Sequence, residues 1–358
     1  MHSPLVQEIL AISQRSAAGV EWLDETIVSE GLRKTLLATA STVPTESEDL
    51  FGYAALESLC PQIRSAAANL KLKFAREPVF ASLPAGDVNA MWVRSPSGQD
   101  LVLLNRGLFI FLMLLGKIAA TFLLTGNSTA GRLDLGGNDV VSHVASNQDG
   151  LQRLKEVLMS QVLFGTPTFA PQYYPPLRIA QLATPLFTSA ELFVVGHEYA
   201  HAMRSGKVQE QTTRRRLFGE VDADAIMRSK KEEIMADGYG LLLMLKAMVA
   251  RRFDVLLSFA GTELLFSGVD ILQDILQLDT RDSHPPSSVR RAGLRMALKL
   301  AVSGQDDTAQ GTELAERAIK LASVLEEAFR AAWAEVKPGF LDEMAALRNT
   351  AFGKSEAG

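Results

Sequence analysis

The sequence predicts a predominantly helical α+β protein with one small β-sheet. Apolar residues recur at helical spacing over most of the 358 residues. Between residues 78 and 106 the pattern changes to the short β-rich runs VFASL, NAMWV and DLVLL, which are separated by the turn clusters PAGD and SPSGQ. The run HEYAH at 197–201 follows a strongly apolar segment, and this indicates that it lies on a central helix.

Composition narrows the class of protein. Hydrophobic residues make up 47% of the chain and charged residues 22%, which is the balance of a globular protein with a sizeable core. A net charge of −5 and a pI of about 5.7 argue against a nucleic-acid partner, which needs a strong basic patch. The single cysteine, Cys60, excludes an internal disulfide and suits a reducing compartment. We therefore expect a cytoplasmic protein of one large domain or two ordinary ones.

Membrane association is not favoured by the sequence. The first residues lack the basic and long apolar regions of a secretory signal. The most apolar stretch covers residues 101–124, but Arg106 and Lys117 interrupt it and leave ten apolar residues between them. Since a membrane span needs about 20 mostly apolar residues, this stretch predicts a buried core helix.

The remaining elements follow along the chain. Residues 1–80 are predicted to be mainly helical, with a break at Val43-Pro44, and a helix is expected again at 107–124. Residues 125–186 are rich in Gly, Pro and small polar residues, which favours a surface loop or lid with a helix near 150–164. The helix that carries HEYAH is expected to begin at Thr188 or Ser189 and to end near Gly206. A polar tract over 207–231 precedes helices from about 229, over 253–279 and at the C-terminus.

The HEYAH run predicts a metal site. Residues four apart on a helix lie one turn apart on the same face, so His197 and His201 can offer two imidazole nitrogens to one metal ion. Glu198 projects from nearly the same side, where its carboxylate can reach a water molecule on the metal. This H-E-x-x-H spacing is typical of zinc peptidases.

A catalytic zinc site usually takes three protein ligands and one water molecule, so a third ligand is needed. One variant of the motif places a further histidine ten residues after the first, but that position is Lys207. The distant histidines are His143 and His284. Glu233, on the next predicted helix, is the better candidate, because it would complete a His-His-Glu site.

Residues close to Glu233 fit the same arrangement. Asp237 lies one turn further on the same helix face, where it could accept a hydrogen bond from the ring nitrogen of His197 that does not bind the metal. Gly238 and Gly240 each cost about 1 kcal/mol of helix propensity relative to alanine. They indicate either a close approach of the two helices, or a kink or an ordinary packing notch.

The segment SHPPSSVRR adds two candidate catalytic residues. Pro285 and Pro286 stiffen the chain after His284, which could donate a hydrogen bond to the oxyanion of a tetrahedral intermediate. Arg290 could orient His284 or a neighbouring carboxylate. The alternative interpretation is that His284 is an ordinary surface residue.

Taken together, these motifs resemble the gluzincin zinc peptidases, in particular the family of the bacterial heat-shock membrane protease and the CAAX-prenyl protease. That family pairs H-E-x-x-H with E-x-x-A-D, which matches residues 233–237, and with a downstream H-P segment followed by Arg. Its upstream strands resemble Asn89-Ala90-Met91-Trp92 and Asn105-Arg106-Gly107-Leu108. The resemblance covers residues 78–295, in the same order.

The resemblance implies a zincin-like metallopeptidase core, with the small β-sheet packed on the HExxH helix. It implies one Zn²⁺ per chain on His197, His201 and Glu233, Glu198 as general base, and a protein or peptide substrate. The extended substrate would pair with the strand that contains Asn89, Ala90, Met91 and Trp92. The core would span residues 78–295 with an insertion at about 125–186, between helical regions at 1–77 and 296–358 that form one compact unit with it.

Two features depart from the family. About 90 residues separate the R-G-L strand from the HExxH helix, and paired transmembrane helices are not evident, so a soluble relative is predicted. Two other functions stay open: a zinc-stabilised helical module that binds a partner without catalysis, and a helical interaction protein in which HEYAH is accidental. The sequence does not specify the substrate or the oligomeric state.

Overall fold

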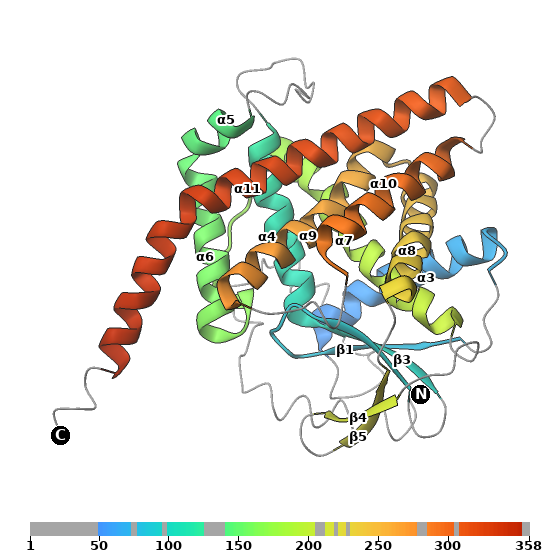
Figure 1. Cartoon of the computed structure of the whole chain (residues 1–358), viewed down its shortest axis with the longest axis horizontal. Coiled ribbons are helices and arrows are strands. Elements are labelled where there is room, and N and C mark those ends of the chain that lie inside the picture. Colours follow the sequence, from blue (N-terminus) through green and yellow to red (C-terminus); the bar gives the residue numbers. More distant parts are fainter. Residues whose placement is uncertain are drawn as a thin grey trace.

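The computed structural model describes residues 49–72, 77–94, 99–124, 140–204, 212–217, 221–226, 230–277, 285–303 and 308–352 (Figure 1). It is predominantly helical with a small sheet, as the sequence predicts. The helices are α3 (Leu50–Asn69), α4 (Arg106–Leu123), α5 (Val140–Ser146), α6 (Gln148–Phe164), the 3₁₀ turn η1 (Pro167–Phe169), α7 (Leu177–Arg204), α8 (Lys230–Ala250), α9 (Val255–Leu276), α10 (Ser287–Ser303) and α11 (Thr308–Phe352).

The sheet lies below one end of the helices (Figure 1). Its strands are β1 (Val79–Leu83), β2 (Ala90–Arg94), β3 (Asp100–Asn105), β4 (Thr212–Leu217) and β5 (Val221–Ile226), in the order β1-β3-β2-β5-β4. Strand β1 runs parallel to β3, and the other neighbours are antiparallel. The three β-rich runs of the sequence therefore form the predicted strands, and β2 and β3 pack against α7, the helix that carries HEYAH.

Strands β4 and β5 correct the sequence prediction, which treated residues 207–231 as a polar tract. The run VDADAI of β5 alternates apolar and acidic residues with the period of two that a half-buried strand requires. In β4, three consecutive arginines interrupt this alternation. The two strands are short and largely polar, so their charged residues obscure the period of two.

Three apolar helices form the centre of the molecule. Helices α4, α7 and α9 pack against one another, and α8, α10 and α11 surround them (Figure 1). The face of the sheet that bears Trp92, Val102 and Leu104 joins the same core. Helix α4 is the buried core helix that the sequence predicts over 107–124, and only its first residue, Arg106, carries a buried charge.

These three helices are also long and apolar enough to cross a membrane, judged by length and composition. Inside the protein, 89%, 67% and 72% of the most apolar windows of α4, α7 and α9 are buried. The sequence identified only the first of these segments as a candidate. The expected cytoplasmic location stays a prediction.

Helix α7 begins earlier than predicted. It starts at Leu177, so Thr188 and Ser189, the expected N-terminal caps, lie in its interior. Pro185 also lies inside this helix, and the Ser189 hydroxyl donates to the carbonyl oxygen of Pro185 at 2.7 Å. Burial of Leu182 and the residues around it favours continuing the helix over the local cap signal. Helix α6 confirms the helix predicted near 150–164, whereas α5 and the first turns of α7 are helical where a surface loop was expected.

Asp49 joins α3 to the sheet and to α4. Its carboxylate accepts from the backbone N–H of Gly52 at 2.6 Å and pairs with Arg106 at 3.1 Å, while its carbonyl accepts from the Ser82 hydroxyl at 2.9 Å. Burial raises the pKa of Asp49 to about 6, because the charge and hydrogen bonds of Arg106 offset only part of the cost of desolvation. The folded chain therefore keeps a proton on Asp49 at pH values where the unfolded chain has lost it.

This raised pKa predicts a pH-dependent contribution to stability. Between the unfolded pKa of about 3.9 and the folded value, the folded state binds more protons, so the contribution is full below pH 4 and falls as the pH rises through 6. Asp49→Asn keeps a helix-capping side chain but cannot titrate. The free energy of unfolding of the wild type, relative to this variant, should fall by at most about 3 kcal/mol between pH 4 and 7. Urea unfolding at several pH values measures this, and parallel curves for the two proteins would contradict it.

Candidate metal centre

Helices α7 and α8 bring three ligand-type side chains together. His197 and His201 lie one turn apart on α7, and Glu233 lies in the first turn of α8. The Nε2 atoms of the two histidines are 3.0 Å apart. The two carboxylate oxygens of Glu233 lie 3.5 Å from Nε2 of His197 and 3.3 Å from Nε2 of His201.

These separations fit a common metal ion. Tetrahedral ligands at about 2.0–2.2 Å from one ion lie roughly 3.3–3.6 Å from each other, and the distances observed here, which involve both oxygens of Glu233, are 3.0–3.5 Å. All three side chains are buried. Gathering two imidazoles around an almost fully buried carboxylate suits a cation that all three share. His197, His201 and Glu233 therefore form a group that could hold a metal ion.

Asp237 supports His197 from the side away from Glu233. Its Oδ1 lies 2.9 Å from Nδ1 of His197, so Nε2 stays directed toward the other ligands. Arg290 of α10 donates to both oxygens of Asp237, from Nε at 2.8 Å and from Nη2 at 2.6 Å. This two-pronged contact fixes the plane of the carboxylate.

The charges of these groups reinforce one another. Burial opposes ionisation of Asp237, but its hydrogen bonds with Arg290 and His197 outweigh burial and lower its pKa to about 2. Burial also opposes a positive charge on His197, yet Asp237 and Glu233 outweigh it and raise the pKa of His197 to about 9. The surroundings of His197 thus favour positive charge at the position where a metal ion would lie.

Glu198 lies beside the three ligand-type residues without being one of them. Its Oε1 is 4.0 Å from Nε2 of His197, and its side chain is 8% exposed. A carboxylate at this distance can reach a small molecule next to the site.

Helices α7 and α8 approach each other closely at Gly240. A Cβ atom added to Gly240 would lie 2.9 Å from the backbone nitrogen of His197 and 3.2 Å from the carbonyl oxygen of Phe193. A Cβ atom at Gly238 would meet nothing within 4 Å. Of the two interpretations left open by the sequence, close helix packing thus holds for Gly240 but does not explain Gly238.

The predicted substrate strand lies next to α7, with its side chains on both faces of the sheet. Asn89 precedes β2, and its carbonyl oxygen accepts from the backbone N–H of Asn105 at 3.1 Å. Trp92 is buried in the main core, whereas Met91 packs on the opposite face of the sheet beside Val93. Within the described residues, β5 is registered with β2 only through Arg94 and Asp224.

Two other histidines considered from the sequence do not join this group. His143 lies on α5, where its Nε2 is 3.3 Å from the carbonyl oxygen of Thr121. His284, the predicted oxyanion donor, falls outside the described residues. Arg290, which the sequence assigned either to His284 or to a carboxylate, binds the carboxylate of Asp237.

No family model, curated protein or solved structure matches this chain in comparisons with known proteins.

Two aromatic residues of the site were not predicted. Phe193 precedes His197 by one turn of α7, and their ring centroids are 6.3 Å apart. Phe266 of α9 packs on Phe193 at 6.0 Å, and the guanidinium of Arg290 lies 5.0 Å from its ring centre. The i−4 spacing of Phe193 from His197 was a usable signal, but nothing local marks Phe266.

Proposed function

We propose that this chain is a zinc-dependent endopeptidase with a zincin-like core. The proposal is carried by one observation: a His-His-Glu group with ligand-like spacing has a second glutamate, Glu198, directly beside it. Three protein ligands leave a fourth position for water or substrate, as in catalytic zinc sites, whereas structural sites are closed by four protein ligands. When bound, Zn²⁺ would polarise a peptide carbonyl and lower the pKa of water to about 7.

The side chains around the site have distinct roles in this proposal. His197, His201 and Glu233 hold the ion, and Asp237 fixes the orientation of His197. Glu198 accepts a proton from the attacking water and later donates it to the leaving amine. His284 remains the candidate donor to the oxyanion.

An extended peptide would pair with the edge of β2 that faces away from β3. Strand β3 occupies one edge of β2, and along the other edge the registered pairing to β5 involves, in the described part of the chain, only the last residue, Arg94. The backbone of residues 89–92 lies next to α7 and is suited to β-addition of substrate. Because Trp92 is buried in the core, substrate contact along this strand is assigned mainly to its backbone.

Removal of the metal tests the proposal directly. Purified protein should contain about one zinc ion per chain, and a chelator should abolish hydrolysis of a mixed peptide library until Zn²⁺ is restored. Zinc at 100 times its Kd should also raise the free energy of unfolding by about 3 kcal/mol. Metal content, mass spectrometry of the library and urea unfolding measure these effects.

The outcomes separate the competing functions. Stoichiometric zinc with no cleavage of the library, or of proteins in cells that express the chain, would favour the zinc-stabilised binding module. Protein without stoichiometric zinc, whose folding is unchanged by His197→Ala, would indicate that HEYAH is accidental.

A further inference from the structure

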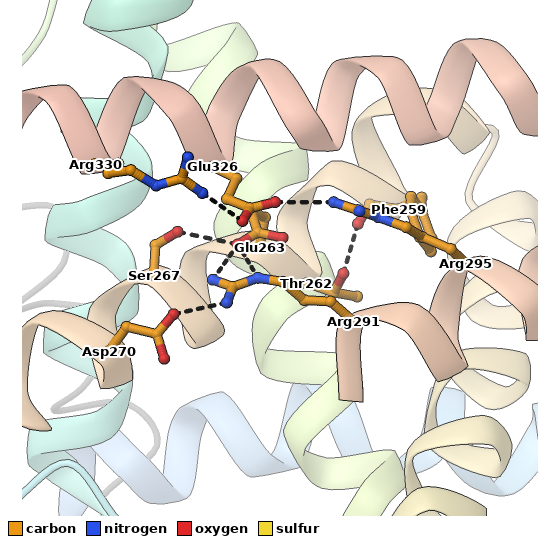
Figure 2. A network of polar contacts seen from close by, with 9 residues as sticks. All are labelled: Phe259, Thr262, Glu263, Ser267, Asp270, Arg291, Arg295, Glu326 and Arg330. Carbon is orange, nitrogen blue, oxygen red and sulfur yellow. Dashed lines mark hydrogen bonds and ion pairs between the residues drawn. The ribbon is translucent and has the colours of Figure 1, made fainter. Parts of the chain in front are cut away.

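Two consecutive arginines of α10 have partners on different helices. Arg290 binds Asp237 of α8, whereas Arg291 binds two acids of α9. Arg291 donates from Nε to Glu263 at 2.7 Å and from Nη1 to Asp270 at 2.6 Å, as Figure 2 shows. The first turn of α10 is therefore held between α8 and α9. The contacts of Arg291 with Glu263 and Asp270 form a clamp on this turn.

The pair of Arg291 and Glu263 in this clamp is almost fully buried. The side chains of Arg291 and Glu263 are 9% and 4% exposed, and that of Asp270 is 41% exposed. The Ser267 hydroxyl also donates to Glu263, at 3.1 Å (Figure 2). Burial raises the pKa of Glu263 despite the hydrogen bond and charge of Arg291, so the cost of desolvating this acid is not fully offset. A buried ion pair of this kind contributes little net stability and can instead fix a geometry.

Phe266 links the clamp to the metal centre. The guanidinium carbons of Arg290 and Arg291 lie 5.0 and 5.6 Å from the centre of its ring. Phe266 in turn packs on Phe193, which neighbours His197. A shift of Arg291 would therefore displace Arg290, because the two residues share a helix turn and both contact the ring of Phe266.

We propose that Arg291, held by Glu263 and Asp270, is a positioning residue for the metal centre. It fixes the first turn of α10 so that Arg290 keeps the Asp237 carboxylate on Nδ1 of His197. This inference rests on the proposed metal site. The sequence did not predict the contacts of Arg291 with Glu263 and Asp270, which lie beyond the three ligand-type residues and beyond Asp237 and Arg290.

Arg291→Lys is the primary test. Lysine keeps the charge but cannot reproduce the fork that contacts two acids at once. Loss of support for a ligand typically weakens metal binding by about 10–100-fold, and one step further out we expect about 10-fold weaker Zn²⁺ binding. The visible absorption of the Co²⁺-substituted protein should shift as well, because the orientation of His197 changes.

Arg295→Lys is the matched control. Arg295 lies one turn further along α10 and pairs with Glu326 of α11 at 2.9 Å, and Glu326 keeps Arg330 as a second partner (Figure 2). This variant should lose a comparable or smaller amount of stability. Its Zn²⁺ affinity should change less than about 2-fold, and its Co²⁺ spectrum should match that of the wild type.

A double-mutant cycle tests whether Arg291 affects Zn²⁺ affinity through Asp237. If Arg291 acts through Asp237, then Arg291→Lys should cause no further loss of Zn²⁺ affinity in an Asp237→Asn background. Arg291→Ala is a poor variant here, because Arg291 lines a cavity of about 130 Å³ beside Trp333, which truncation would enlarge. Should Arg291→Lys fail to fold, Asp270→Asn changes the exposed end of the same clamp, with an expected loss of about 3-fold in affinity.

The results that would overturn the inference are specific. Equal Zn²⁺ affinities and Co²⁺ spectra for the wild type, Arg291→Lys and Asp270→Asn would show that the clamp does not position the metal centre. Additive losses for Arg291→Lys and Asp237→Asn would exclude the route through Asp237. A wild-type protein that binds no stoichiometric zinc overturns the proposed function itself, so this failure can be told apart from the other two.

Discussion

Replacement of Glu198 by glutamine is expected to reduce peptide hydrolysis by about 10²–10⁴-fold, while folding and zinc content stay at wild-type levels. Glutamine has the shape of glutamate but cannot accept the proton of the attacking water. Glu198 lies 4.0 Å from Nε2 of His197, and it is not one of the three residues whose spacing suits metal binding. Its loss should therefore affect the chemical step rather than the metal site.

Glu191→Gln is the matched control for this substitution. Glu191 lies on the same helix, and burial raises its pKa to about 8 although the charge of Arg251 opposes this. At pH 7 it therefore carries a proton for most of the time, and glutamine replaces a neutral group. We expect this variant to hydrolyse peptides at the wild-type rate.

The measurement combines zinc analysis with the identification of new protein N-termini in cells that express the wild type or one of the two variants. N-termini that disappear in Glu198→Gln and persist in Glu191→Gln mark cleavage by this chain. Hydrolysis by Glu198→Gln at the wild-type rate would refute its role as general base. Loss of zinc from Glu198→Gln would instead identify Glu198 as a ligand.

Spacing within a single helix explains why much of the metal centre could be predicted. The i, i+4 relation places His197 and His201 on one face whatever the rest of the fold does, and the same holds for Glu233 and Asp237. Short apolar runs such as DLVLL, bounded by turn clusters, likewise predict strands before any partner is known. Each of these predictions depends on residues that are close in the sequence.

Features that depend on distant packing could not be predicted in the same way. Arg290 and Asp237 are 53 positions apart, and only the docking of α10 on α8 selects this partner among the available acids. The start of α7 was misplaced because burial of its first turns overrides the cap signal at Thr188 and Ser189. The clamp around Arg291 combines acids of α9 with a base of α10, and no local pattern marks such a pair.

Gly240 lies where the two ligand helices touch, and Gly240→Ala should separate them. The added Cβ atom would lie 2.9 and 3.1 Å from the backbone nitrogen and Cα of His197, which cannot rotate away. Helix α8 must then shift and carry Glu233 and Asp237 with it. Overpacking of this kind typically costs about 1–3 kcal/mol, of which the better helix propensity of alanine returns at most about 1 kcal/mol. Zinc affinity should fall by about 10-fold or more, because a ligand and its support both move.

Gly238→Ala provides the same substitution two residues away on the same helix. Its Cβ atom would meet nothing within 4 Å, so only the gain in helix propensity remains. We expect this variant to be more stable than the wild type by about 0.5–1 kcal/mol, with unchanged zinc affinity. If α7 and α8 must touch at Gly240, urea unfolding should show a lower free energy of unfolding for Gly240→Ala and a higher one for Gly238→Ala. Zinc titration should show weaker binding for Gly240→Ala alone. If both alanine variants behave alike, then the separation of these helices does not control the metal centre.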